Sequence, residues 1–296
     1  MRRIQDGFTL VEMIMVIVIT GIIGGMVAVF LKAPIDQYMD VARRADMTDI
    51  ADTALRRIGR DLRLALPNSV RVTVVGNNTF LEFLPTTGGG RYRAGAALAG
   101  ASAGCGSLGS DVLDFTAADT CFEVLGPMPN MVAGATPDQV VVYNLGIPRP
   151  ATCPAPLPAQ CGSDAYQGDN RAAYVATNAS TITIAARQFP FDSPGRRFQV
   201  ISRPVTYVCA PAPNGINGTL TRYWGYPIQS AQPTALGTLT SVNPGAMLAG
   251  NVSNCRIGYD AAVVAQRSGL VTMNLGITES GDTVTLYSAT HVSNEP

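Results

Sequence analysis

The sequence predicts an α+β protein in which one long N-terminal helix packs on an antiparallel, β-rich head tied by disulfides. An almost wholly apolar run opens close to the N-terminus, and an amphipathic pattern follows it as far as residue 66. The remainder of the 296 residues holds short strand-like segments separated by Gly- and Pro-rich stretches, together with all six cysteines. These observations favour a helix that leaves a separate head at its C-terminal end.

The apolar run Phe8–Leu31 is long enough to cross a membrane, and Glu12 is its only charged residue. About 20 apolar residues span the hydrocarbon core of a bilayer. Arg2 and Arg3 precede the run, and positive residues favour the cytoplasmic side. We therefore expect one transmembrane helix over residues 8–31, in the inner membrane, with everything after it in the periplasm.

The residues around the start of this run have a distinctive order. Gly7-Phe8-Thr9-Leu10-Val11-Glu12 follows a short charged leader, residues 1–7, and precedes the uncharged part of the helix. This arrangement resembles the class III signal of type IV pilins and pseudopilins. The resemblance implies that a prepilin peptidase cuts between Gly7 and Phe8 and methylates the new amino terminus. It also implies that Glu12 serves in subunit assembly.

A carboxylate inside an apolar helix needs a compensating partner. Cleavage would give Phe8 an α-amino group with a pKa of about 8, one helical turn from Glu12. In a filament, Glu12 of one subunit can pair with the Phe8 amine of its neighbour. The alternative is a carboxylate favoured only by the helix macrodipole. Gly21, Gly24 and Gly25 lie in the same helix. One interpretation is local melting or close helix contact during filament packing, because small residues let backbones approach. The alternative is that glycine is simply tolerated there, as it commonly is in membrane helices.

Residues 32–66 predict an amphipathic continuation of the helix. Apolar residues recur at three- and four-residue steps, and charges fill the opposite face. Pro34 predicts a kink or a short interruption, and Pro67-Asn68 predicts the end. Several arginines on this face alternate with aspartates and lack accompanying aromatic side chains, which disfavours nucleic-acid binding. They are Arg43, Arg44, Arg56, Arg57, Arg60 and Arg63.

Residues 67–296 predict a periplasmic β-rich head that is nearly neutral, with 12 basic and 13 acidic side chains after residue 63. Gly76-Asn77-Asn78 separates the first two predicted strands, which favours a hairpin. Loops are expected at Gly88–Gly109, Pro148–Pro158 and Ala210–Gly218. The predicted strands are Val70–Val75, Thr79–Leu84, Asp111–Thr116, Gln139–Tyr143, Thr181–Ala186, Phe198–Ser202, Val205–Cys209, Leu220–Trp224, Leu270–Ile277 and Thr283–Tyr287.

Six cysteines on the outer side of the membrane favour disulfides over a metal site, because the spacing offers no Cys-x-x-Cys or histidine ligands. Fifteen connectivities are possible. We predict pairing between sequence neighbours, namely Cys105–Cys121, Cys153–Cys161 and Cys209–Cys255.

Patterns that would indicate catalysis or ligand binding are weak, and we expect no enzyme, cofactor or metal. Residues 100–104 match the nucleophile-elbow formula, but the only histidine is His291. Residues 104–109 match the dinucleotide formula without a strand before or a helix after them. Asp164, Asp169 and Asn170 could supply oxygen ligands to calcium, but their spacing fits no standard calcium-binding loop. We favour a solvated loop. A sugar platform at Tyr223, Trp224 and Tyr226 is less favoured than strand packing.

Further segments resemble the MshO-type minor pilins of MSHA (mannose-sensitive haemagglutinin) pilus biogenesis. They are Ala54–Arg63, Leu66–Arg71, Arg197–Val200, Val205–Cys209, Leu220–Tyr226 and His291–Pro296. The resemblance implies a minor pilin that primes or caps the pilus, ending at its tip. Its partners would be the prepilin peptidase, other minor pilins, the major pilin, the inner-membrane assembly platform and the lipid bilayer. The alternatives are a J-type minor pseudopilin of type II secretion and a tip adhesin.

Overall fold

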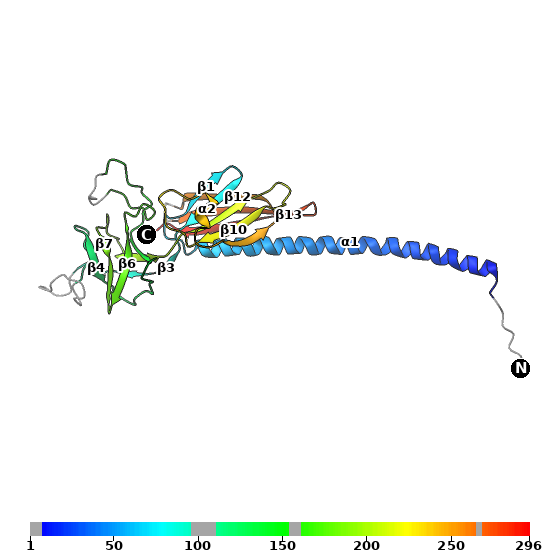
Figure 1. The fold of residues 1–296 in the computed structure, drawn as a ribbon, viewed down its shortest axis with the longest axis horizontal. Helices are drawn as coiled ribbons and strands as arrows, with labels where there is room; N and C mark the ends of the chain where they lie inside the picture. The colour runs from blue at the N-terminus through cyan, green and yellow to red at the C-terminus, as the bar shows by residue number, and fades with distance from the viewer. Residues whose placement is uncertain (1–7, 96–110, 154–160, 265–267) are drawn as a thin grey trace, which may run out of the picture.

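A computed structural model describes residues 8–95, 111–153, 161–264 and 268–296. One long helix, α1, extends away from a head that consists of two lobes (Figure 1). The proximal lobe packs along one side of the C-terminal half of the helix, and the distal lobe lies beyond the helix end, at the opposite extremity from the N-terminus (Figure 1). The predicted α+β class, with a long helix and an antiparallel β-rich head, is confirmed.

Helix α1 runs without a break over Leu10–Leu62, through Pro34. The predicted interruption at this proline is therefore wrong. Proline removes one backbone donor and crowds the preceding turn, which a long helix can absorb by bending. The projecting half of the helix curves gently (Figure 1). The apolar and amphipathic stretches are thus parts of one continuous helix.

The helix ends at Leu62, four residues before the predicted end. The amides of Leu64 and Ala65 bond to carbonyls only three residues back, which tightens the chain into a turn. Leu66 then donates its amide to the Leu84 carbonyl. The residues after Leu62 form hydrogen bonds with the edge of a strand instead of extending the helix. These tertiary hydrogen bonds therefore end the helix before it reaches Pro67.

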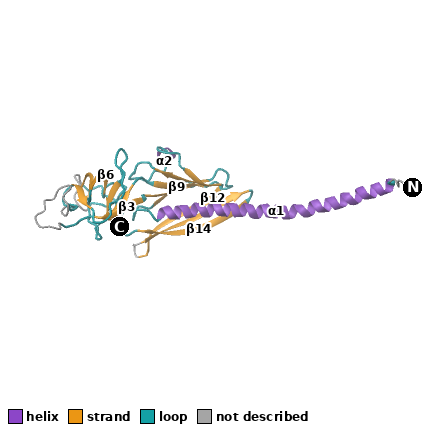
Figure 2. Ribbon diagram, turned by 90° about the horizontal axis from the view of Figure 1, so that it is seen from below, coloured by secondary structure: helices purple, strands orange, loops and turns teal. Residues whose placement is uncertain are grey.

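The proximal lobe contains two antiparallel sheets that pack on one face of the helix. The first has the order β1-β2-β9-β10-β11 and the second β12-β13-β14. Figure 2 shows α1 running alongside these strands, and it contacts β11, β13 and β14. The bounds are β1 Arg71–Val75, β2 Asn78–Phe83, β9 Val205–Ala210, β10 Thr219–Trp224, β11 Ala246–Gly250, β12 Val252–Val264, β13 Ser268–Glu279 and β14 Asp282–Ser293. A short helix, α2, spans Leu236–Leu239.

The apolar stripe of the helix forms the centre of this lobe. Met47, Ala51, Ile58 and Leu62 are fully buried or nearly so against strand residues that include Tyr207. The predicted hairpin is confirmed: β1 and β2 pair as antiparallel neighbours, with Val75 opposite Asn78. The stripe therefore marks the helix face that the head covers.

The distal lobe is built on one six-stranded sheet with the order β3-β8-β5-β6-β7-β4. One face is apolar and packs a core that includes Phe122, Val140, Phe198 and Val200. A small cluster with Leu66 and Tyr166 joins the two lobes. The bounds are β3 Thr86–Arg91, β4 Asp119–Glu123, β5 Gln139–Val142, β6 Arg171–Asn178, β7 Thr181–Arg187 and β8 Arg197–Ile201.

Several strand predictions fail for local reasons. Asp111–Thr116 is not a strand, because the Asp114 carboxylate accepts hydrogen bonds from both the amide and the hydroxyl of Thr116 at 2.7 Å and forms a turn. Conversely, the Gly-rich stretch predicted as a loop begins with strand β3. A side chain at Gly89 would lie 2.7 Å from the Phe198 carbonyl, so glycine permits this close pairing. Strands β4, β6, β11 and β12 were not predicted.

Two disulfides lie within the described residues. Cys153 pairs with Cys161 and Cys209 with Cys255, with Cα atoms 6.0 and 6.4 Å apart. Cys121 is also disulfide-bonded. The predicted Cys105–Cys121 pair falls partly outside the described residues, because Cys105 lies in residues 96–110. The Cys209–Cys255 bond links the two sheets of the proximal lobe.

Candidate functional site on the N-terminal helix

The helix begins at the residues that the sequence assigns to processing and assembly. Thr9 caps α1: its carbonyl accepts the Glu12 amide at 3.1 Å and its hydroxyl accepts the same amide at 3.4 Å. The Phe8 side chain is 81% exposed, and Glu12 lies exposed in the first turn. Gly7 is outside the described residues. Phe8 and Glu12 are thus accessible to a neighbouring subunit.

The projecting half of α1 has no partner within the described chain. Every large apolar side chain between Leu10 and Leu31 is exposed. Leu10–Leu62 is the one described helix whose length and composition would allow it to cross a membrane. Thr20 satisfies its hydroxyl internally by donating to the Val16 carbonyl at 2.5 Å, which suits an apolar surrounding. This surface requires lipid or other helices.

The glycines of the projecting half lie in regular helix. Side chains built at Gly21, Gly24 or Gly25 would meet no atom within 4 Å. No packing within the described part of the chain therefore requires glycine there. Close approach of a neighbouring helix and local melting both stay predictions.

The other half of α1 is joined to the head by polar contacts as well as by its apolar stripe. Asp61 accepts hydrogen bonds from the Tyr207 hydroxyl at 2.7 Å and from Arg222 Nε at 2.9 Å. Arg43 and Arg44 both contact Asp282 at the turn between β13 and β14. These polar contacts therefore attach the second half of α1 to the head near both of its ends.

The side chains considered as calcium ligands make contacts inside the distal lobe, while Asp169 Oδ2 and Asn170 Oδ1 are buried without a hydrogen-bond partner among the described residues. Asp169 forms an ion pair with Arg149, and Asp164 accepts the Tyr166 amide at 2.8 Å. Asn170 is buried and donates to Asn144 and Ser163. No group of three or more potential metal ligands of the His, Cys, Asp or Glu type occurs among the described residues. These side chains organise a loop.

The proposed sugar platform is mostly buried. Tyr226 is inaccessible to solvent and Tyr223 is nearly so, while Trp224 lies against the guanidinium of Arg222, 5.0 Å from its ring centroid. The packing interpretation of these aromatics therefore holds. The nucleophile-elbow and dinucleotide patterns lie outside the described residues, and His291 is exposed on β14.

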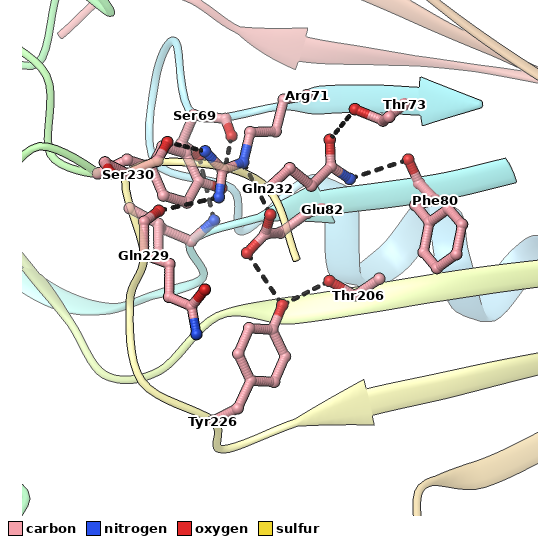
Figure 3. Close-up of polar contacts among 12 residues, drawn as sticks. Ser69, Arg71, Thr73, Phe80, Glu82, Thr206, Tyr226, Gln229, Ser230 and Gln232 are labelled. Atoms are coloured by element: carbon pink, nitrogen blue, oxygen red, sulfur yellow. Dashed lines mark hydrogen bonds and ion pairs between the residues drawn. The ribbon is translucent and has the colours of Figure 1, made fainter. Parts of the chain in front are cut away.

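A buried polar cluster in the proximal lobe escaped the sequence analysis (Figure 3). Glu82 is inaccessible to solvent and accepts Arg71 Nε at 2.7 Å and the Tyr226 hydroxyl at 3.0 Å. Burial raises the pKa of the Glu82 carboxyl, and the Arg71 contact opposes that rise. Arg71 also donates to the carbonyls of Gln229 and Ser230. The cluster fastens the segment after β10 to the β1–β2 hairpin.

The cluster could be found only in part from the sequence. Arg71 and Glu82 are directly opposite in the β1–β2 register, which a hairpin prediction implies. Tyr226 and Ser230 are more than 140 residues away along the chain, and no local pattern connects them to this pair.

Comparison with known proteins bears on the helix. Residues 2–28 match the model of the prokaryotic N-terminal methylation motif, a range that contains Gly7, Phe8 and Glu12. This match supports a type IV pilin-like protein and implies processing by a prepilin peptidase and assembly with other pilins. The motif and the apolar helix fit a membrane-anchored protein with a soluble head. No curated protein and no solved structure matches the chain.

Proposed function

We propose that the chain is a minor type IV pilin that primes or caps an MSHA-type pilus and has no catalytic role. The observation that carries the proposal is an uncovered apolar half-helix that begins at a methylation motif and bears one carboxylate, Glu12. Such a surface supports lateral packing among parallel helices, first in the inner membrane and then in a filament. The partners are other minor pilins, the major pilin and the inner-membrane assembly platform.

Assembly proceeds through the start of the helix. Removal of residues 1–7 exposes the Phe8 amine, which becomes methylated and stays cationic. Glu12 of one subunit pairs with this amine on the adjacent subunit, because both charges are otherwise uncompensated in an apolar surrounding. The pair aligns neighbouring helices at one register.

The shape of the head supports a position at the tip. The distal lobe extends past the C-terminal end of α1, away from the N-terminus (Figure 1). Subunits added below encounter the slender half of the helix. A subunit placed above would have to occupy the volume of the distal lobe. A head of this form is therefore better accommodated at the end of a filament than at repeated internal positions.

A deletion strain tests the assignment. We expect loss of sheared surface pili, seen by electron microscopy, together with unchanged protein secretion into the medium. Restoration of pili by the intact gene is the control. Lost secretion with normal pili would overturn the proposal in favour of a J-type pseudopilin of type II secretion.

A further inference from the structure

A groove of about 660 Å³ lies on the proximal lobe, between the β1–β2 hairpin and the sheet β12-β13-β14. Both strands of the hairpin contact β12, so the two sheets of the lobe adjoin at this place. Val74 and Asn77 line the groove from the hairpin, and both side chains are exposed. A groove of this volume is typical of sites that take a small ligand.

Part of the groove floor is the face of the β12-β13-β14 sheet that points away from α1. Met273 and Leu275 are buried in the core that this sheet shares with the helix, and strand alternation places Asn274 on the opposite face. Arg256 on β12 and Tyr287 on β14 are each directly opposite Asn274 in register, so they share its face. All three residues line the groove. The register therefore aligns a cation, an amide and an aromatic ring in one row across three strands.

Each residue of this row has a binding capacity that the described chain leaves unused. Tyr287 is 67% exposed, which leaves its ring available for stacking. Arg256 is exposed and forms no ion pair within the described residues. The side-chain oxygen of Asn274, Oδ1, is buried and has no hydrogen-bond partner in the described part of the chain. A buried acceptor without a donor is unfavourable, and a ligand hydroxyl would satisfy it after a small rotation of the amide, whose terminal torsion is broad.

The chemistry of the groove narrows the class of ligand. Among the described residues that line it, Arg256 is the only charged one, and the other polar side chains are the amides of Asn77 and Asn274 and the hydroxyls of Thr79, Thr272 and Tyr287. Amides and hydroxyls are donors and acceptors that suit the hydroxyl groups of a sugar, and one guanidinium suits one carboxylate. Nucleic acid would require a row of cations along its backbone. The groove therefore favours a saccharide that carries a carboxylate.

We propose that this groove binds an acidic saccharide, with a sugar ring stacked on Tyr287, its carboxylate paired with Arg256 and a hydroxyl group bonded to Asn274. A planar guanidinium presents paired donors that match the two oxygens of a carboxylate. A tyrosine ring offers an apolar face to the C–H groups of a sugar and a polar hydroxyl at its edge. Because the row lies on the sheet face opposite α1, binding leaves the contacts between the helix and the head in place.

Calorimetric titration of the full chain tests the proposal, in micelles of a detergent that has no sugar headgroup. The acidic probes are trigalacturonic acid and sialyllactose. Their neutral counterparts are the methyl ester of trigalacturonic acid, which keeps the same hydroxyl groups, and lactose. We expect saturable binding of at least one acidic probe, about tenfold or more tighter than the binding of its neutral counterpart.

Variants then locate the site. Tyr287→Ala and Arg256→Gln should each weaken binding of the acidic probe by about tenfold. Arg256→Gln should also bring the acidic probe and its neutral counterpart to nearly equal affinity, because it removes the partner of the carboxylate. Tyr38→Ala and Arg57→Gln remove the same side-chain groups from exposed positions on α1 and should bind as the unmodified chain does. Near-UV circular dichroism checks that each variant is folded.

Three results would overturn the site. They are no saturable binding of either acidic probe, equal affinity of the unmodified chain for the acidic and neutral probes, and unchanged affinity in Tyr287→Ala. None of these results depends on filament assembly, so the proposed function is tested independently.

Discussion

The two halves of α1 differ in where their packing partners lie. From Leu10 to Leu31 the large apolar side chains are exposed, whereas Met47, Ile58 and Leu62 are buried in the proximal lobe. Both halves belong to one uninterrupted helix. Burying a large aliphatic side chain contributes about 1.5–3 kcal/mol, so the second half stabilises the head. The first half can gain this free energy only from lipid or from other subunits.

The sharpest test of this division is Glu12→Ala. We expect membrane insertion and leader cleavage to continue, while incorporation into sheared pili is lost, because the partner of the neighbouring Phe8 amine is removed. Immunoblots of the membrane and pilus fractions measure the two outcomes. Asp36→Ala, an exposed charge change outside the apolar segment, is the matched control. Normal amounts of the Glu12 variant in pili would contradict the assembly role.

The next test compares equal truncations in the two halves. Ile58→Ala should lower the free energy of unfolding of the head by about 2–5 kcal/mol, because it removes buried methyl groups and leaves a cavity. Ile17→Ala, on the exposed half, should leave that value within about 0.5 kcal/mol. Denaturant titrations in micelles followed by Trp224 fluorescence measure both. Equal losses would mean that the projecting half also supports the head.

Polar attachment of the buried half is tested by Asp61→Asn. The change weakens the contacts with Tyr207 and Arg222 and leaves the half-buried guanidinium without its counter-charge. We expect a loss of about 1–3 kcal/mol in the free energy of unfolding. Asp52→Asn, in the exposed pair with Arg56, should cost about 0–1 kcal/mol. A larger loss for Asp52→Asn would reverse the assignment of the anchoring contact.

The smallest expected effect is a pH dependence of stability that arises from the contact of Arg43 and Arg44 with Asp282. Hydrogen bonds from Arg44 and Arg43 lower the pKa of the Asp282 carboxyl below 3.8. The stability that this contact contributes is therefore present above that value and is lost as the pH falls through the folded-state pKa. Thermal unfolding between about pH 5 and pH 2 should show a slightly steeper acid loss for the unmodified chain than for Asp282→Asn. Parallel curves would argue against the contact.

Sequence patterns predicted the elements whose burial follows a simple period. The stripe of α1 and the β1–β2 hairpin are visible in spacing and turn residues alone. The same reasoning failed where side chains compete with the backbone, as at Asp114, and where glycine serves close strand pairing, as at Gly89. Long strands such as β12 were missed because their alternation is interrupted by small and polar residues.

The candidate sites divide in the same way. Phe8 and Glu12 could be identified from the sequence because their predicted roles follow from the order of neighbouring residues at the start of an apolar run. The Glu82 cluster depends on Tyr226 and Ser230, which lie far along the chain from Arg71 and Glu82. No local pattern in the sequence indicates such contacts.

The sequence by itself determined that an apolar helix with one carboxylate lies near the N-terminus and that a disulfide-tied β head follows. Hydrophobic periodicity and local motif order are sufficient for this, because they are properties of neighbouring residues. Only the tertiary structure decided where the helix ends, how the head divides into two lobes and which distant side chains contact the buried Glu82. Those features depend on hydrogen bonds and charges brought together across long stretches of chain, whose free energies no local window contains.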